Sequence, residues 1–133
     1  MDTAEAPPTL TTLAWSPSAG LRTLNGLDEV RAALADPEER LWIDVAEPGG
    51  PLLQQVGQML GLHPLVIEDI GEQNQRAKIE LTGDELHLVM FHLGYVGELI
   101  ATELDIVVSS RFLLSAHPAD VPLMSPAYLR RGP

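Results

Sequence analysis

Cysteine is absent from this chain of 133 residues, and basic side chains are scarce. Without cysteine the chain forms no disulfide, offers no thiolate nucleophile and builds no cysteine-ligated zinc site, which suits a reducing compartment. Eight lysines and arginines stand against 19 aspartates and glutamates, so the formal net charge is −11. A surface this acidic repels phosphate backbones and anionic lipid. We therefore expect no nucleic-acid partner.

A long apolar run is missing as well. The longest uncharged stretch, residues 48–67, could cross a bilayer by length, but it holds three prolines, four glycines and three glutamines. Such a composition does not form a membrane helix. The first ten residues, MDTAEAPPTL, lack both the basic region and the apolar segment of a signal peptide. We expect a soluble chain that does not insert into a membrane.

The length suits one domain built around a single core. Hydrophobic residues make up 45% of the chain and charged residues 20%, which is typical of a globular protein. We expect a flexible acidic tail at residues 1–8 and a single domain over residues 9–133.

Seven stretches have the composition of β-strands, namely residues 9–15, 21–24, 40–48, 76–81, 85–96, 101–110 and 111–117. Three helices are expected among them: one that Asn25 caps, one from Pro51 to Gly61 and one from Pro64 to Gly71. This order predicts an α/β fold, specifically an α/β/α sandwich on a mixed parallel and antiparallel sheet of about six to seven strands. Residues 86–93 are apolar on both faces, which predicts a central strand covered on both sides.

The four histidines do not form a metal-binding pattern. His87 and His92 are five positions apart on one expected strand, so they point to opposite faces. His63 and His117 each precede a proline and belong to no spaced pair, and there is no HExxH motif. We expect all four to be structural.

Enzymatic motifs are equally sparse. No serine lies in a GxSxG turn, and no glycine-rich loop carries a lysine at phosphate-binding spacing. Asp44 and Glu47, at a strand end, could act as paired carboxylates. A solvated or helix-capping role for Asp44 is favoured over that pairing.

The helix expected at residues 64–71 places one acid in an unusual position. At about 100° per residue, Glu68 and Glu72 fall opposite the apolar arc, which indicates a solvated face. Asp69 falls between Leu65 and Val66, inside that arc, and should be partly desolvated. Two interpretations stay open. Asp69 pairs with Arg76, Lys78 or backbone N–H groups within the fold, or it lies at a protein boundary where it can bind a divalent ion.

Four segments together resemble a known family. They are LWIDVAEP (41–48), LGLHPLVIEDI (60–70), NQRAKIE (74–80) and FLLSAHP (112–118). The pattern resembles the N-terminal cytoplasmic domain of CorA-type magnesium transporters, and the related zinc transporter ZntB shares it. The resemblance runs from about Leu41 to His117, with Ala77 where the family usually has proline.

The resemblance implies a regulatory, metal-sensing domain on the cytoplasmic side of the inner membrane, and not an enzyme. Family members continue into a stalk helix and two membrane helices and form homopentamers. The implied partners are therefore the protein's own stalk and membrane region and further copies of the chain. By the same resemblance Asp69, with Glu68 close by, helps to hold a regulatory Mg²⁺ between subunits, with Co²⁺ or Zn²⁺ as alternatives. The given sequence contains neither stalk nor membrane helices, so we expect a soluble fragment of a membrane protein.

Two other functions stay open. An acidic soluble chain could be a stand-alone protein-interaction module. A small hydrolase could use Asp44 or Asp69, but the sequence assembles no nucleophile, base or metal set around either residue.

Overall fold

The computed structural model describes residues 10–119 of the chain. The expected tail at residues 1–8 and the segment from residue 120 onward lie outside this range. The described elements, in chain order, are β1 (Leu10–Ser16), β2 (Gly20–Leu24), α1 (Gly26–Leu34), β3 (Arg40–Ala46), α2 (Pro51–Leu60), α3 (Pro64–Glu72), β4 (Lys78–Thr82), β5 (Glu85–Tyr95), β6 (Leu99–Val108) and β7 (Phe112–His117). Among them no helix is long and apolar enough to cross a membrane.

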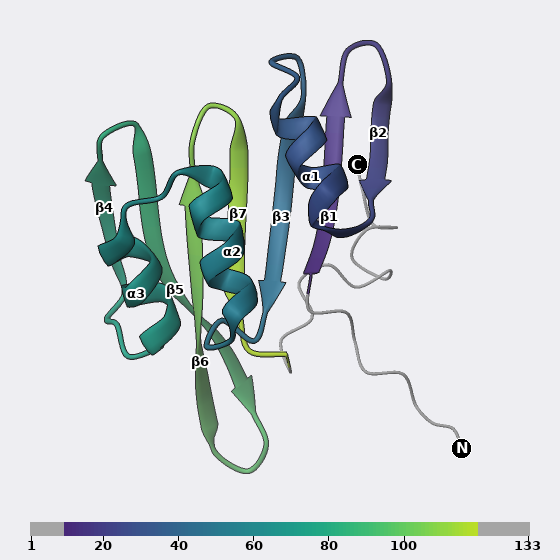
Figure 1. The fold of residues 1–133 in the computed structure, drawn as a ribbon. Helices are drawn as coiled ribbons and strands as arrows, with labels where there is room; N and C mark the ends of the chain where they lie inside the picture. The colour runs from purple at the N-terminus through teal and green to yellow at the C-terminus, as the bar shows by residue number, and fades with distance from the viewer. Residues whose placement is uncertain (1–9, 120–133) are drawn as a thin grey trace.

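The seven strands form one mixed sheet in the order β2-β1-β3-β7-β6-β5-β4 (Figure 1). Strands β3 and β7 pair in parallel, and the other five pairings between described strands are antiparallel. The expected α/β fold with a mixed sheet is therefore confirmed.

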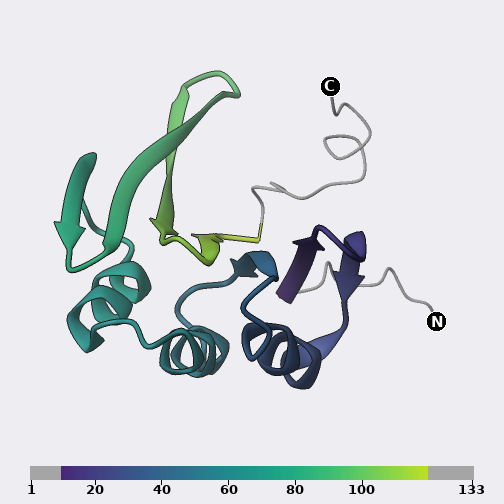
Figure 2. The same cartoon turned by 90° about the horizontal axis from the view of Figure 1, so that it is seen from above.

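The helices α1, α2 and α3 lie along one face of this sheet (Figure 2). They cover it with a single hydrophobic core, in which side chains of the helices meet those of the central strands. Its fully buried members include Val30, Ile43, Val45, Val56, Ile70, Leu114 and Ala116. Within residues 10–119 the opposite face carries no helix, so the second helical layer of the expected sandwich is not part of the described range.

The helix ends follow local signals with two exceptions. Asn25 stands at the N-cap position of α1, but its side chain makes no capping hydrogen bond, so the expected cap is wrong. Pro51 and Pro64 open α2 and α3, and Gly61 closes α2 with a left-handed φ of 72°. Helix α3 does not end at Gly71 as expected, because it continues through Glu72 to a C-cap at Gln73 with φ 55°. A positive φ is uncommon for a residue other than glycine, so side-chain bonds of Gln73 must hold this end in place.

The expectation that residues 86–93 form a central strand covered on both sides is wrong. Strand β5 lies next to the edge strand β4, and it is the second strand from that edge of the sheet. Its outer half is exposed, including Met90, Phe91 and Leu93. The apolar character of these residues therefore has another cause than burial within this fold.

Candidate functional site on helix α3

Helix α3 is positioned by its N-terminal cap and by its apolar face. The His63 ring accepts a hydrogen bond from the Leu65 backbone N–H at 3.1 Å, and so caps the helix. Val66, Ile67 and Ile70 are buried against the core. The helix is therefore fixed in rotation, and this decides where its acidic side chains point.

Asp69 points toward strand β4. Its side chain is 36% exposed, and its carboxylate lies 3.8 Å from the Lys78 ammonium. The expected partial desolvation is confirmed, and of the two expected partners Lys78 forms the ion pair. The same ammonium lies closer to Glu80, at 3.0 Å. Because Lys78 is shared and Asp69 partly exposed, the pair contributes at most about 1 kcal/mol to stability.

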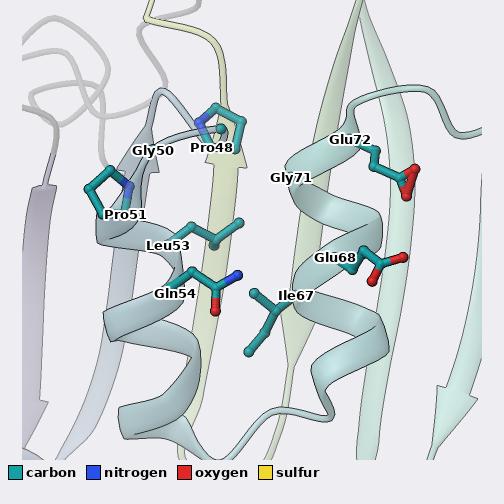
Figure 3. Close-up of a pocket in the computed structure, with 10 residues that line it drawn as sticks. Pro48, Gly50, Pro51, Leu53, Gln54, Ile67, Glu68, Gly71 and Glu72 are labelled. Atoms are coloured by element: carbon teal, nitrogen blue, oxygen red, sulfur yellow. The ribbon is translucent and has the colours of Figure 1, made fainter.

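Glu68 belongs to the lining of a groove of about 340 Å³ between α2 and α3, but its carboxylate is directed away from α2 (Figure 3). Figure 3 shows Glu68 and Glu72 on α3 beside this groove, and Leu53 and Ile67 facing one another across it. Both glutamates are exposed, as their solvated interpretation predicts. Asp69 is not among the residues that line the groove, and adjacent positions on a helix are about 100° apart, so Glu68 and Asp69 do not share one direction.

A buried polar cluster, which sequence reasoning missed, fixes the C-terminal end of α3. The Gln73 side-chain amide donates to Asp105 at 2.9 Å and reaches Glu103 at 3.5 Å. The Gln75 backbone N–H donates to Glu103 at 2.8 Å, and His87 contacts Asp105 at 2.9 Å. These bonds tie the segment after α3 to strands β5 and β6, which explains the left-handed C-cap at Gln73.

Glu103 in this cluster holds its proton unusually tightly. Burial, and next the hydrogen bond to Asp105, raise the pKa of Glu103 to about 7, although the Gln75 N–H and the charge of Lys78 oppose the rise. Two neighbouring carboxyl groups in a buried site cannot both ionise without a large cost, so one of them retains a proton.

Asp44 belongs to a second buried network, on strands β3 and β7. Ser115 Oγ donates to the Asp44 carboxylate at 2.5 Å, and Trp42 Nε1–H donates to Ser115 at 2.9 Å. His117 Nε2 lies 2.8 Å from Asp44, and its Nδ1 lies 2.7 Å from the Pro118 carbonyl oxygen. Both ring nitrogens of His117 thus lie within hydrogen-bond distance of oxygen atoms.

This network does not have the arrangement of a catalytic triad. The serine hydroxyl donates to the carboxylate, whereas an activated serine donates to histidine. The solvated or helix-capping role favoured for Asp44 is wrong, because the residue is 5% exposed. Its expected partner Glu47 is exposed and lies outside the network. His63, His87 and His117 have structural roles, as expected, while His92 is exposed on β5.

Metal-binding groups do not gather elsewhere in residues 10–119. No cluster of three or more His, Cys, Asp or Glu side chains within this range has an arrangement that could hold a metal ion. Asp69 therefore offers a single carboxylate on the β4 side of α3.

Sequence comparison decides the family. The pattern of the family described as CorA-like Mg²⁺ transporter protein matches residues 37–131. The chain belongs to this family. The resemblance carried by residues 41–117 is thus confirmed. Because the CorA family consists of transporters, the expectation that the chain is not an enzyme is confirmed as well.

Several solved structures share the fold of this chain. The structure of the full-length CmaX protein aligns with a TM-score of 0.69 and 17% identity, over 96% of this chain and 40% of that one. The soluble domain of CorA from Methanocaldococcus jannaschii aligns with a TM-score of 0.56 and 17% identity, over 80% and 40%. The cytoplasmic domain of ZntB from Vibrio parahaemolyticus aligns with a TM-score of 0.60 and 10% identity, over 92% and 48%.

This CorA-family chain spans less than half the length of each of those three proteins. At these identities the likeness shows a shared fold and nothing finer. A search among curated proteins finds no match to the sequence.

Proposed function

We propose that this chain is a regulatory, metal-sensing domain of a CorA-like divalent-cation transporter, located on the cytoplasmic side of the inner membrane. The observation that carries the proposal is the position of Asp69, a half-exposed carboxylate on the α3 helix of a CorA-family domain, held by one loose ion pair. The ion is Mg²⁺, or else Co²⁺ or Zn²⁺. The partners of this domain are the stalk and membrane region of a longer chain and further copies of the chain in a homopentamer.

The residues present fit a weak ion site. Mg²⁺ prefers carboxylate oxygens and usually keeps several of its waters, so one or two carboxylates from each subunit suffice. Asp69 supplies such an oxygen, and Glu68 adds negative charge nearby without sharing its direction. A bound ion would neutralise acidic groups that face one another across a subunit boundary. If one state of the assembly binds the ion more tightly than the other state does, ion binding shifts the equilibrium toward the tighter-binding state.

Lys78 competes with the ion for Asp69. Its ammonium occupies the same side of the carboxylate at 3.8 Å, and it has Glu80 as a second partner when Asp69 is withdrawn. A cation that displaces Lys78 from Asp69 therefore costs little free energy, because Lys78 keeps its ion pair with Glu80. If Asp69 is only a salt-bridge partner, removing Lys78 should lower the stability of the domain. If Asp69 binds a cation, removing Lys78 should raise the affinity for that cation.

Calorimetric titration with Mg²⁺ tests the proposal. The chain alone should bind weakly, in the millimolar range typical of sites with few protein ligands. Asp69→Asn should abolish the heat signal, and Lys78→Met should strengthen binding by up to about fivefold, since it removes a competing ion pair. Glu38→Gln, which removes an exposed carboxylate before β3 and leaves the Asp69–Lys78–Glu80 group intact, is the matched control and should retain binding. Sub-micromolar affinity, or binding unchanged in Asp69→Asn, would overturn the assignment of a half-site to Asp69.

A further inference from the structure

The segment that follows helix α3 has no regular structure of its own. Residues 73–77 belong to neither helix nor strand, and they connect α3 to strand β4 (Figure 1). Gln73 begins this segment with φ 55°, a left-handed backbone that is unfavourable for a residue with a side chain. None of the strand pairings within residues 10–119 includes the segment. Individual hydrogen bonds must therefore keep it in place.

Those hydrogen bonds are made to two neighbouring carboxyl groups on β6. Glu103 and Asp105 are alternate residues of one strand, so they lie on the same face of the sheet. Both are buried, with exposed fractions of 6% and 1%. The Gln73 side-chain amide donates to Asp105 at 2.9 Å, and the Gln75 backbone N–H donates to Glu103 at 2.8 Å. The segment is thus docked on β6 through this carboxyl pair.

One oxygen of the carboxyl pair is short of a donor. Asp105 has His87 at one oxygen and the Gln73 amide at the other, both at 2.9 Å. The two hydrogens of that amide are used by Asp105 and by the Ile70 carbonyl oxygen, at 3.1 Å. Glu103 Oε2 is left with a long contact of 3.5 Å to the same amide. A proton on the pair fills this gap, because a carboxylic acid donates to a neighbouring carboxylate.

The surrounding charges do not remove the need for that proton. The titratable groups that face Glu103, directly or through Lys78, are Asp105 on β6, His87 on β5, Lys78 and Glu80 on β4, and Asp69 on α3. The Lys78 ammonium is already shared between two other carboxylates, at 3.0 and 3.8 Å. Two adjacent carboxylates in a buried site repel one another and lose hydration. The raised pKa of Glu103 places the loss of the shared proton near neutral pH.

We propose that residues 73–75 form a proton-dependent latch at the end of α3. While Glu103 and Asp105 share one proton, the latch stays docked on β6. When both groups are ionised, the latch detaches, water reaches the two carboxylates, and Gln73 leaves its left-handed backbone. The latch moves rather than the strands, because β6 is paired on both sides with β5 and β7. The device needs no bound cation, so it does not rest on the function proposed above.

The direction of the pH response follows from the exposure of Glu103. In the detached state Glu103 meets water, and its pKa returns toward 4.5 from about 7. The docked state therefore binds the proton more tightly, and it is most favoured below pH 4.5. Detachment becomes more favourable by up to about tenfold for each pH unit between 4.5 and 7, and the gain levels off above this range.

Amide hydrogen exchange followed by NMR tests the latch at the Gln75 N–H, which is bonded directly to Glu103. After correction for the intrinsic pH dependence of exchange, its protection factor should fall by about tenfold or more between pH 5 and pH 8. At each pH it should also lie below the protection factors of the β3 amides, because the latch opens without unfolding of the core. Equal protection of Gln75 and of β3 would overturn the proposal, since the segment would then open only with the whole domain.

Variants separate the latch from a contact that is only structural. Glu103→Gln cannot ionise, so the protection of Gln75 should change by less than about twofold between pH 5 and pH 8. Gln73→Gly removes the amide but permits the left-handed backbone, so Gln75 should be weakly protected at both pH values. Glu98→Gln, between β5 and β6, is the matched control and should keep the full pH response.

Two further results would contradict the latch. In the unaltered chain, equal protection of Gln75 at pH 5 and pH 8 would mean that the segment stays docked when the pair is ionised, for example because Lys78 neutralises the second charge. A pH response of Gln75 that persists in Glu103→Gln would mean that another group controls the segment.

Discussion

Glu103 is the side chain whose protonation the fold controls most clearly. It is buried between β6 and the segment after α3, facing Asp105, Gln73, the Gln75 N–H and Lys78, with His87 bonded to Asp105. Its pKa rises from 4.5 to about 7 in the folded state, so the native protein binds this proton more tightly than the unfolded chain does. The stabilisation is complete below pH 4.5 and is lost as the pH rises through about 7.

We predict that Glu103→Gln abolishes this pH dependence. Glutamine keeps the shape of the protonated carboxyl group and can still donate to Asp105 and accept from Gln75. The variant should therefore be more stable than the unaltered chain at pH 8, on the order of 1–3 kcal/mol, and nearly equal to it at pH 5. Urea unfolding at both pH values measures the difference. An equal pH slope in both proteins would show that Glu103 does not hold the proton.

Asp44 gives a second prediction for a single residue. Asp44→Ala leaves the His117 ring and the Ser115 hydroxyl buried without their shared acceptor. Each buried donor left without an acceptor costs about 1–3 kcal/mol, so the variant should lose roughly 2 kcal/mol or more of unfolding free energy. Glu47→Ala, three positions on and exposed, should change the unfolding free energy by less than about 0.5 kcal/mol. Similar small losses in both variants, measured by urea unfolding, would contradict the structural role of this network.

Residue roles could be predicted from the sequence only where the partner is close in the chain. The helical arc placed Asp69 inside the apolar face, and the residue is partly buried, although Leu65 on the same side of the helix is exposed. Lys78, nine positions away, was one of its expected partners. The roles of Asp44 and Glu103 were missed because their partners are distant in the sequence: Ser115 reaches Asp44 through the pairing of β3 with β7, and Gln73 reaches Glu103 from the end of helix α3. A carboxylate inside an apolar strand such as residues 41–46 was the available signal.

Helices α2 and α3 pack closely at Gly57. A methyl group added there would lie 2.6 Å from Ile67 Cδ1 and 2.7 Å from Cγ1, and Ile67 is itself buried. Gly57→Ala should therefore destabilise the domain by about 1–2 kcal/mol, since the overlap outweighs the gain in helix propensity. In Gly71→Ala the new methyl group meets the Pro48 carbonyl oxygen at 3.6 Å, an ordinary contact.

We expect Gly71→Ala to be neutral or stabilising by up to about 1 kcal/mol, because alanine favours the helix. Thermal unfolding of the two variants measures both effects. Equal destabilisation by the two substitutions would mean that the close approach at Gly57 does not distinguish the two sites.

Element boundaries were predictable where a local signal exists. Proline and glycine marked both ends of α2, and hydrophobic alternation marked the strands. The end of α3 was misplaced by local reasoning, because bonds from Gln73 to β6 carry the helix past Gly71. The covered central position expected for β5 was wrong for a similar reason. Apolar residues on both faces indicate contact, but they do not say whether the contact lies within the same fold.

For the whole molecule, the α/β class and the mixed sheet followed from the order of elements. The strand order did not, since the parallel pairing of β3 with β7 joins segments separated by most of the domain. This pairing matters for the candidate site, because it sets the central strands on which α2 and α3 pack. The ion-binding role proposed for Asp69 rests on the family resemblance, since the fold alone shows this residue as one member of an ion pair.

The central claim is that the Asp69 side of α3 binds a divalent cation. Backbone amide NMR spectra recorded during a Mg²⁺ titration test it residue by residue. The account predicts saturable shifts at residues 68–72 and at Lys78 in the millimolar range, absent in Asp69→Asn and retained in Glu38→Gln. Shifts spread evenly over the acidic surface, or equal shifts in Asp69→Asn, would contradict it.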